Sequence, residues 1–196
     1  MSLIPSGSQT VGPFFNFALT TDRALGTLAR DGVQGERIRL EFRVTDGDGA
    51  PTPGDSMIEL WQADAGGVYD GGDPNFLGAG RAVTDEEGNY RFLSIKPGAY
   101  PWRNHRNAWR PAHIHFSLFG TEFTQRMVTQ MYFPGDPLFA LDPIYQSVVD
   151  PAARARLVAT YDHELTQPEW CTGYRWDIVL TGAHRTLMEA DQEVDR

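Results

Sequence analysis

Hydrophobic and polar side chains alternate along the segment ERIRLEFRVTDGDGAP, which covers residues 36–51. Ile38, Leu40, Phe42 and Val44 occupy every second position, and charged residues separate them. A period of two is typical of a strand that has one face in a core and the other toward solvent. The DGDG run predicts a tight turn, because Asp and Gly tolerate the backbone angles of a reversal.

Further short apolar segments follow along the chain, and turn residues separate them. Residues 80–95, GRAVTDEEGNYRFLSI, predict a hairpin with DEEG at its tip. Single strands are expected in four other segments, SMIELWQAD (56–64), AHIHFSLFG (112–120), QRMVTQMYF (125–133) and YRWDIVLTG (174–182).

One segment, residues 150–165, has a helical pattern. Asp150 is a suitable N-cap, and Pro151 suits the first helical position. The apolar stripe of this helix would consist of Leu157, Val158, Tyr161 and Leu165. Many short strands with a single helix predict an all-β fold, namely an antiparallel β-sandwich with long loops and one short helix.

The composition is that of a globular protein, with 196 residues, 41% hydrophobic and 22% charged. No repeat or linker divides the sequence, so we expect a single domain over residues 1–196. Residues 1–35 show no strand or helix pattern. Phe14, Phe15 and Phe17 within this stretch favour an N-terminal arm that packs at a subunit interface.

Charge and cysteine content exclude several classes of protein. A net charge of −9 argues against nucleic acid or an anionic membrane as a partner. The single cysteine, Cys171, excludes an internal disulfide and a cysteine-rich zinc site. The N-terminus resembles no signal peptide, and no apolar run approaches the roughly 20 residues of a membrane span. We therefore expect a cytoplasmic protein.

The segment AHIHFSLFG places two histidines on one face of an expected strand. Side chains alternate between the two faces of a strand, so His113 and His115 share one side. The opposite side, which carries Ile114, Phe116 and Leu118, would face the core. Two imidazoles at this spacing can approach one metal ion, which is a common basis for a metal site in a β-protein.

The histidine pair does not identify the metal or the remaining ligands. Of the remaining histidines, which are His105, His163 and His184, the last two have no supporting context in the sequence. Glu122 follows a glycine turn at a spacing that does not fit a cupin-like site. A zinc hydrolase would need a third histidine or a carboxylate beside an activated water.

Two tyrosines are further candidates for metal ligands. Tyr69 ends the segment WQADAGGVY, and Tyr100 precedes His113 by thirteen residues in the unusual stretch YPWRNHRNAWRPAHIHF. Either tyrosine alone would be interpreted as a packing residue. A tyrosinate is a hard anionic oxygen donor that suits a ferric ion. Two histidines with two tyrosines would form such a site.

Long ordered motifs closely resemble the intradiol ring-cleaving dioxygenases, and among them the protocatechuate-cleaving type. The motifs are WQADAGGVY, DPNFLGAGR, TDEEGNYRFLSIKPGAYPWR, WRPAHIHF, TQMYFPGDPL and YRWDIVL. The resemblance extends from residue 8 to about residue 186. It implies a non-haem Fe(III) cofactor held by Tyr69, Tyr100, His113 and His115.

The resemblance also implies roles for residues around the metal. Arg110 and Gln130 would line the active site, and Tyr100 would be the ligand that is displaced when the substrate binds. Trp61, Trp102 and Ile144 would form walls of the substrate pocket. The implied reaction inserts both atoms of O2 between the hydroxyl-bearing carbons of a catechol, which converts protocatechuate to 3-carboxy-cis,cis-muconate.

The N-terminus resembles one of the two chain types in this family, and the ligand set resembles the other. The short segment SQTVGPF is similar to the α-type arm, which would contribute Thr10, Gly12, Pro13 and Phe14 to the substrate pocket. The four metal ligands are those of the β-type chain. The chain could be an α-type subunit that kept the ligands or a self-sufficient homo-oligomer, and we expect a related dioxygenase chain or a second copy as its partner.

Two other classes remain possible at this point. The chain could be a non-catalytic α-type partner subunit of a heteromer, or a zinc protein that uses the histidine pair. An intradiol enzyme acting on another substituted catechol is a third alternative.

Overall fold

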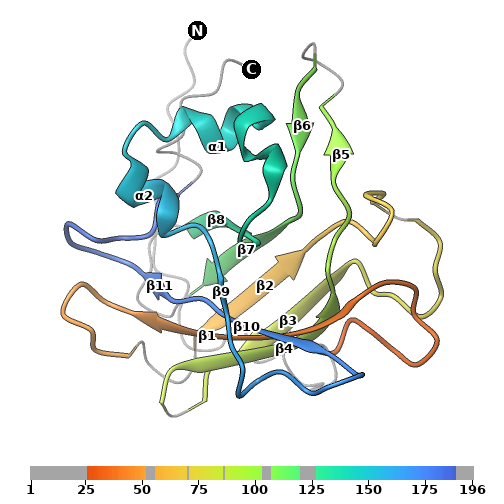
Figure 1. Ribbon diagram of the computed structural model, residues 1–196. Helices are drawn as coiled ribbons and strands as arrows, with labels where there is room; N and C mark the ends of the chain where they lie inside the picture. Colours follow the sequence, from red (N-terminus) through yellow and green to blue (C-terminus); the bar gives the residue numbers. More distant parts are fainter. Residues whose placement is uncertain are drawn as a thin grey trace, which may run out of the picture.

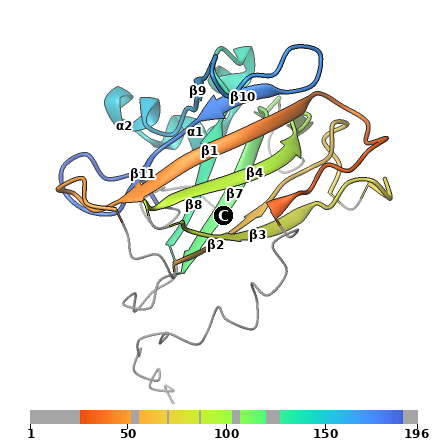
Figure 2. The same cartoon turned by 90° about the horizontal axis from the view of Figure 1, so that it is seen from below.

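The computed structural model describes residues 26–51, 56–69, 71–85, 87–102, 107–119 and 127–188. In this part of the chain, two sheets pack face to face (Figures 1 and 2). The first sheet has the order β11-β1-β10-β9, and β4 also pairs with β1. Its strands are β1 (Arg37–Thr45), β4 (Asn89–Ile95), β9 (Thr160–Tyr161), β10 (Thr172–Arg175) and β11 (Ile178–Val179).

The second sheet is antiparallel throughout and has the order β3-β2-β7-β8. Its strands are β2 (Met57–Trp61), β3 (Ala79–Val83), β7 (His113–Phe119) and β8 (Met127–Tyr132). A short ribbon of β5 (Tyr100–Pro101) and β6 (Trp109–Arg110) extends toward the end of the molecule that carries the helices (Figure 1). This arrangement confirms the prediction of an all-β sandwich.

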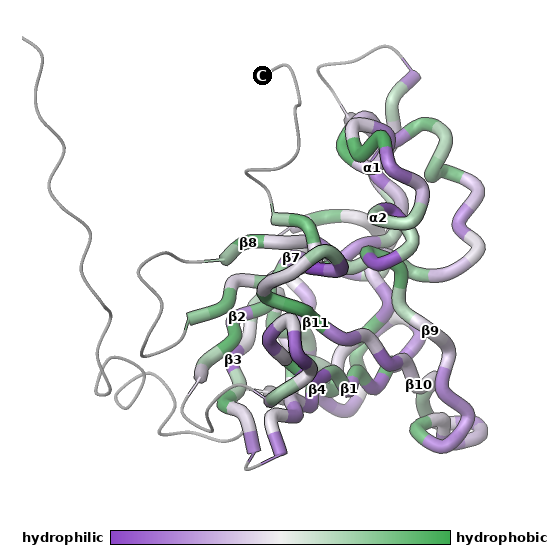
Figure 3. Tube along the Cα trace, turned by 90° about the vertical axis from the view of Figure 1, so that its left-hand side faces the viewer, coloured by the Kyte–Doolittle hydropathy of each residue, from purple (hydrophilic) through white to green (hydrophobic). Residues whose placement is uncertain are grey.

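The core lies between the two sheets and is built by the period-two patterns of the sequence. Every second residue of β1 is buried, and Ile114, Phe116 and Leu118 of β7 pack into the same cluster. Figure 3 shows hydrophobic and hydrophilic positions following one another along β1 and β4. Because one face of β7 is committed to the core, its histidines must point to the other face.

The expected hairpin over residues 80–95 is wrong, although the turn itself is present. Asp85 accepts a hydrogen bond from the backbone N–H of Asn89 at 2.7 Å and so closes the reversal. However, β3 pairs with β2 and β4 pairs with β1, so the chain crosses between the sheets at this turn. The segment YRWDIVLTG likewise forms two strands, β10 and β11, and both pair with β1 in parallel.

The expected helix over residues 150–165 is much shorter. It is α2 (Pro151–Ala155), capped by Asp150 as predicted. Residues 157–159 instead run beside β8, where Leu157 and Ala159 exchange backbone hydrogen bonds with Tyr132. Pairing with β8 therefore overrides the helical pattern of the sequence. Tyr161, which was expected on the apolar stripe of the helix, lies in β9. Two further helical segments were not predicted, namely the 3-10 helix η2 (Pro137–Leu141) and α1 (Pro143–Ser147).

Within the described ranges, no helix has both the length and the apolar character needed to cross a membrane.

Candidate metal centre

The histidine pair lies on the outer face of β7, away from the core, as the strand pattern predicted. The His113 and His115 rings have centroids 4.9 Å apart. The register of the sheet places Tyr132 of β8 opposite His113, and Trp61 of β2 and Gln130 of β8 opposite His115. Since residues opposite one another share a face, these three side chains surround the pair.

Tyr100 reaches the pair from the ribbon of β5 and β6. Its hydroxyl lies 3.2 Å from Nε2 of His113. Nδ1 of His113 lies 2.7 Å from the backbone oxygen of Pro111. A carbonyl can only accept a hydrogen bond, so Nδ1 carries the proton and the lone pair of Nε2 points toward Tyr100. Such a bond on the far nitrogen is the usual way to orient a ligating histidine.

Tyr69 reaches the same point from the loop that follows β2. Oδ1 of Asp64 accepts hydrogen bonds from the backbone N–H groups of Gly66 and Val68, at 2.8 and 3.0 Å, and so shapes this loop. Gly67 has a φ of 77°, and a Cβ there would lie 2.5 Å from the backbone oxygen of Ala99. The loop therefore packs directly against the residue before Tyr100, and the hydroxyls of Tyr69 and Tyr100 are 3.5 Å apart.

The spacing of these donor atoms fits a single metal ion. Ligands that bind one ion at about 2 Å lie roughly 3 Å from each other. The distances from the Tyr100 hydroxyl to Nε2 of His113 and to the Tyr69 hydroxyl, 3.2 and 3.5 Å, are close to that value. Among the described residues, no group of three or more His, Cys, Asp or Glu side chains could hold a metal. Within the described residues, the phenol oxygens of Tyr69 and Tyr100 are donors that lie beside the histidine pair.

The protonation of the two histidines suits a cation, and the pKa of Tyr69 shows what its ionisation would require. Burial, followed by the nearby Arg110 charge, lowers the pKa of His115 to about 3. The same two causes hold the pKa of His113 well below its ordinary value, so both imidazoles are neutral. Burial and the hydrogen bond to Tyr100 raise the pKa of Tyr69. Ionised phenols at this place would need a compensating positive charge, which a ferric ion supplies.

Arg110 is held beside the cluster by contacts with Asp142, Gln130 and Trp102. Its Nε donates to Oδ2 of Asp142 at 3.3 Å, one Nη donates to Oε1 of Gln130, and the guanidinium lies 5.4 Å from the centre of the Trp102 ring. The hydroxyl of Tyr132 donates to the same oxygen of Gln130 at 3.3 Å. Burial opposes the charge of Arg110, but Tyr132 and Asp142 raise its pKa, so it remains a cation.

The structure brings most of the expected site residues together. Trp61 stacks on His115, with ring centroids 5.0 Å apart and the rings 4° from parallel. Ile144 lies on α1, and its backbone N–H donates to Asp142. The expected arm residues lie outside the described part of the chain, and they are Thr10, Gly12, Pro13 and Phe14.

The sequence interpretation missed Tyr132 and Asp142. Tyr132 is fully buried, and its ring centroid lies 5.9 Å from that of His113. The period of β8 puts Tyr132 on the face of Gln130, but the pairing register of two strands is not visible in the sequence. Asp142 precedes a proline, which is a signal for a helix start that could have drawn attention to it.

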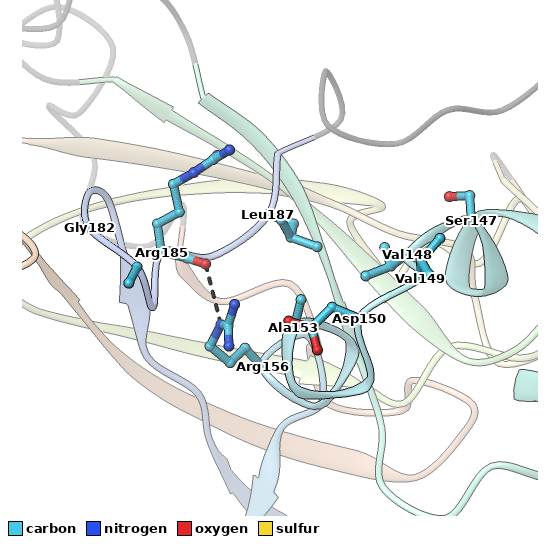
Figure 4. A pocket seen from close by; sticks show the side chains of 10 residues that line it. Ser147, Val148, Val149, Asp150, Ala153, Arg156, Gly182, Arg185 and Leu187 are labelled. Carbon is cyan, nitrogen blue, oxygen red and sulfur yellow. Dashed lines mark hydrogen bonds between the residues drawn. The ribbon is translucent and has the colours of Figure 1, made fainter.

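A separate pocket of about 520 Å³ lies between α2 and the segment after β11 (Figure 4). Its lining includes Asp150, Arg156 and Arg185, and Arg156 donates to the backbone oxygen of Arg185 at 3.4 Å. None of the tyrosines and histidines above lines it, so this pocket is not the candidate centre.

Comparison with known proteins agrees with this geometry. The sequence profile of the Dioxygenase family matches residues 10–182. The protocatechuate 3,4-dioxygenase beta chain of Burkholderia cepacia is 50% identical over an alignment of 191 positions, and the match covers 93% of this chain and 78% of that one. The corresponding alpha chain of Pseudomonas putida is 30% identical over 95% of this chain and 97% of its own length.

Solved structures show the same fold. The crystal structure of 3-chlorocatechol 1,2-dioxygenase from Rhodococcus opacus 1CP matches with a TM-score of 0.63 and 26% identity, over 78% of this chain and 63% of that one. This chain thus spans less than two thirds of that enzyme. From the profile match and the similarity to both protocatechuate dioxygenase chains, the protein belongs to the dioxygenase family, among its intradiol ring-cleaving members.

Proposed function

We propose that the chain catalyses the Fe(III)-dependent intradiol cleavage of a catechol by O2, with protocatechuate as the substrate and 3-carboxy-cis,cis-muconate as the product. The observation that carries this proposal is the convergence of Tyr69, Tyr100, His113 and His115 from three separate segments. The choice of protocatechuate is supported by the 50% identity to a protocatechuate 3,4-dioxygenase beta chain. Such a reaction belongs to the catabolism of aromatic compounds.

Each of the four side chains has a role in this proposal. His113 and His115 would be neutral nitrogen ligands, and Tyr69 and Tyr100 would be anionic oxygen ligands of the iron. A ferric ion bound there would accept the two oxygens of a catechol as ligands and would activate the ring toward O2. A catechol must lose its hydroxyl protons in order to chelate, and the oxygen of Tyr100 is placed to accept one of them.

Arg110 and Gln130 would act on the substrate beside the metal. Arg110 is a permanent cation whose direction is fixed by Asp142 and Gln130. A fixed charge in a buried place can stabilise negative charge that develops on a ring oxygen without reorganising during the reaction. Gln130, which accepts from both Arg110 and Tyr132, would hold this cation in place.

The ring of the substrate would lie between aromatic and aliphatic walls. Trp61 and Trp102 already contact His115 and Arg110, respectively, and Ile144 is the second residue of α1, the helix that Asp142 caps. The N-terminal arm would supply the binding site for the ring carboxylate, through backbone N–H groups near Gly12 and the hydroxyl of Thr10. Glycine would allow the backbone to approach the ligand closely.

A non-catalytic α-type subunit is the second candidate. Its support is the 30% identity to a protocatechuate 3,4-dioxygenase alpha chain, which the match covers over 97% of its length. The higher identity to the beta chain, together with four converging donors, favours a chain that carries its own iron. In either case we infer an oligomer formed with a related dioxygenase chain or with further copies of this one.

Metal analysis together with a visible absorption spectrum tests the proposal. The purified protein should contain one iron per chain and should be reddish-brown, because tyrosinate ligands give charge-transfer bands with Fe(III). Protocatechuate added without oxygen should shift these bands. A colourless protein with full ferric iron would rule out tyrosinate ligands, and a preparation that never binds iron would support the non-catalytic subunit or a zinc site.

A further inference from the structure

Three aspartates after β8 are each followed by proline, and each caps a short helix. Asp136 begins η2, Asp142 begins α1 and Asp150 begins α2. In all three, Oδ1 accepts a hydrogen bond from the backbone N–H two residues later, at 2.9 Å. The three caps are therefore equivalent in their local geometry, and they differ in what the second carboxylate oxygen does.

The second oxygens of two caps hold the segment that leads to the histidine pair. Oδ2 of Asp136 accepts from the backbone N–H of Ala112 at 3.2 Å, one residue before His113. Oδ2 of Asp142 accepts from Nε of Arg110 at 3.3 Å. Asp150 is exposed, and in the described part of the chain its carboxylate makes the capping contact alone.

The environment of Asp142 is unusual for a helix cap. Its side chain is fully buried, and the side chain of its partner Arg110 is 6% exposed. Removing two charges from water is costly, and their attraction repays that cost where geometry and further hydrogen bonds are good. Asp150 shows that a cap in this segment functions at the surface, so capping alone does not account for the burial of Asp142.

The contacts of Arg110 show how the ion pair with Asp142 can set the orientation of its guanidinium. Asp136 fixes the backbone at Ala112, two residues after Arg110, while Gln130 and Trp102 contact the guanidinium at one Nη and at its face. Asp142 is the acceptor at Nε, which sets the rotation of the guanidinium plane. Its other oxygen holds the N-terminus of α1 and so ties Arg110 to the helix that carries Ile144.

We propose that Asp142 is a positioning residue, which orients the guanidinium of Arg110 toward the catechol and fixes it relative to α1. This inference rests on the function proposed above. The ion pair would thus set the direction of a charge that acts on the substrate, while the metal ligands remain independent of it.

The test uses Asp142→Asn, with Asp150→Asn as its matched control. Asparagine keeps the capping oxygen for the N–H of Ile144, but its amide presents N–H groups to Nε of Arg110. We expect Asp142→Asn to retain iron and the spectral shift with protocatechuate, and to lower kcat about tenfold or more. Asp150→Asn should leave iron, spectrum and kcat unchanged. A kcat of Asp142→Asn within twofold of the wild type would overturn the proposal.

A double-mutant cycle distinguishes positioning from a general structural role. If Asp142 acts through Arg110, the Asp142→Asn change should lower kcat far less in an Arg110→Lys background than in the wild type. The same factor in both backgrounds would contradict the proposal.

Should Asp142→Asn fail to fold, Asp142→Glu is the second variant. It keeps a carboxylate to compensate the buried charge of Arg110, but it displaces that carboxylate. We expect Asp142→Glu to keep its full iron content and to have a lower kcat than the wild type. A wild-type kcat in this variant would contradict the inference.

The two proposals fail in different ways. If the wild-type protein cleaves no catechol, the proposed function is wrong, whatever Asp142 does. A crystal structure of Asp142→Asn then decides the positioning role alone. A guanidinium of Arg110 that has rotated away from its place over Trp102 supports the role, and an unchanged Arg110 overturns it.

Discussion

His113 and His115 illustrate how a ligand site follows from the chemistry of single residues. Burial keeps both imidazoles neutral, and the bond between Nδ1 of His113 and the Pro111 carbonyl leaves Nε2 free to bind. A neutral imidazole in a fixed orientation needs little reorganisation to coordinate a metal.

Replacing either histidine of the pair should therefore abolish iron binding. We expect His113→Ala and His115→Ala each to lose iron and turnover, because an incomplete ligand set binds the metal at least tenfold more weakly. Iron per chain is measured after purification in parallel. His163→Ala, at an exposed histidine whose Nδ1 lies 3.3 Å from the Tyr161 hydroxyl, is the control and should keep full iron. Normal iron in either variant of the pair would show that the pair is not the metal site.

The sequence predicts part of this centre from physical pattern alone. The histidine pair follows from the period of one strand, and His113 and His115 do share a face. Tyr69 and Tyr100 lie 31 positions apart, on the loop after β2 and on β5, so their approach depends on tertiary packing that no local pattern contains. Their role came from family resemblance. Asp142 and Tyr132 were missed because a buried polar network becomes visible only when the elements are placed in space.

Among the structural elements, the loop that carries Tyr69 depends on a glycine for its approach to Tyr100. Gly67→Ala would place a Cβ 2.5 Å from the Ala99 oxygen and 3.2 Å from Cβ of Tyr100. We expect this variant to lose iron, because the loop that carries Tyr69 can no longer pack against Ala99 and Tyr100 at its present distance. Metal analysis and thermal unfolding measure the effect.

Gly49→Ala is the matched control for that variant. Gly49 has a similar φ of 84°, but an added Cβ would meet no atom within 4 Å. Both variants carry the cost of a left-handed conformation, about 1–2 kcal/mol, and only Gly67→Ala adds a collision at the site. Equal iron content in the two variants would mean that close packing of the Gly67 loop against Ala99 and Tyr100 is not needed for the metal centre.

Glu41 joins three strands of the first sheet and predicts a pH-dependent contribution to stability. It accepts hydrogen bonds from Arg91 of β4 at 2.7 Å and from Arg175 of β10 at 2.8 Å. Burial would raise the pKa of Glu41, but these two arginines hold it below its ordinary value. A lowered pKa in the folded state stabilises the protein above the unfolded value, and this contribution is lost as pH falls through the folded value.

Glu41→Gln should accordingly destabilise the protein by about 1 kcal/mol at pH 7, a typical size for cross-strand ion pairs. The difference from wild type should shrink as pH falls below about 4.3, the ordinary value for a glutamate. Urea unfolding at a series of pH values measures it. Glu164→Gln, at an exposed glutamate after β9, should have little effect at any pH. A difference that stays constant down to pH 2 would speak against the ion pairs as its origin.

The elements themselves were predictable to different degrees. Alternation located β1 and β7 correctly, and short apolar segments bounded by turn residues located β2 and β8. The hairpin and the long helix were wrong for a common reason. Turn residues and helical periodicity are local signals, whereas the choice of a partner strand is made by the whole sheet.

On the scale of the whole molecule, the account places the carboxylate preference in the N-terminal arm. Deleting residues 1–15 should leave iron bound and raise the KM for protocatechuate far more than the KM for unsubstituted catechol, because catechol has no carboxylate to recognise. Steady-state kinetics with both substrates measure the two effects. Equal changes for both substrates, or none, would leave the arm as an interface segment without a part in specificity.

The central claim is that this chain opens a catechol ring between its hydroxyl-bearing carbons and inserts both atoms of O2. Mass spectrometry of the product formed from protocatechuate under ¹⁸O-labelled dioxygen tests it most directly. The account predicts 3-carboxy-cis,cis-muconate with both labelled atoms retained in its two new carboxylates. A product with one labelled atom, a ring opened beside the hydroxyl-bearing carbons, or no ring opening by the iron-loaded protein would contradict it.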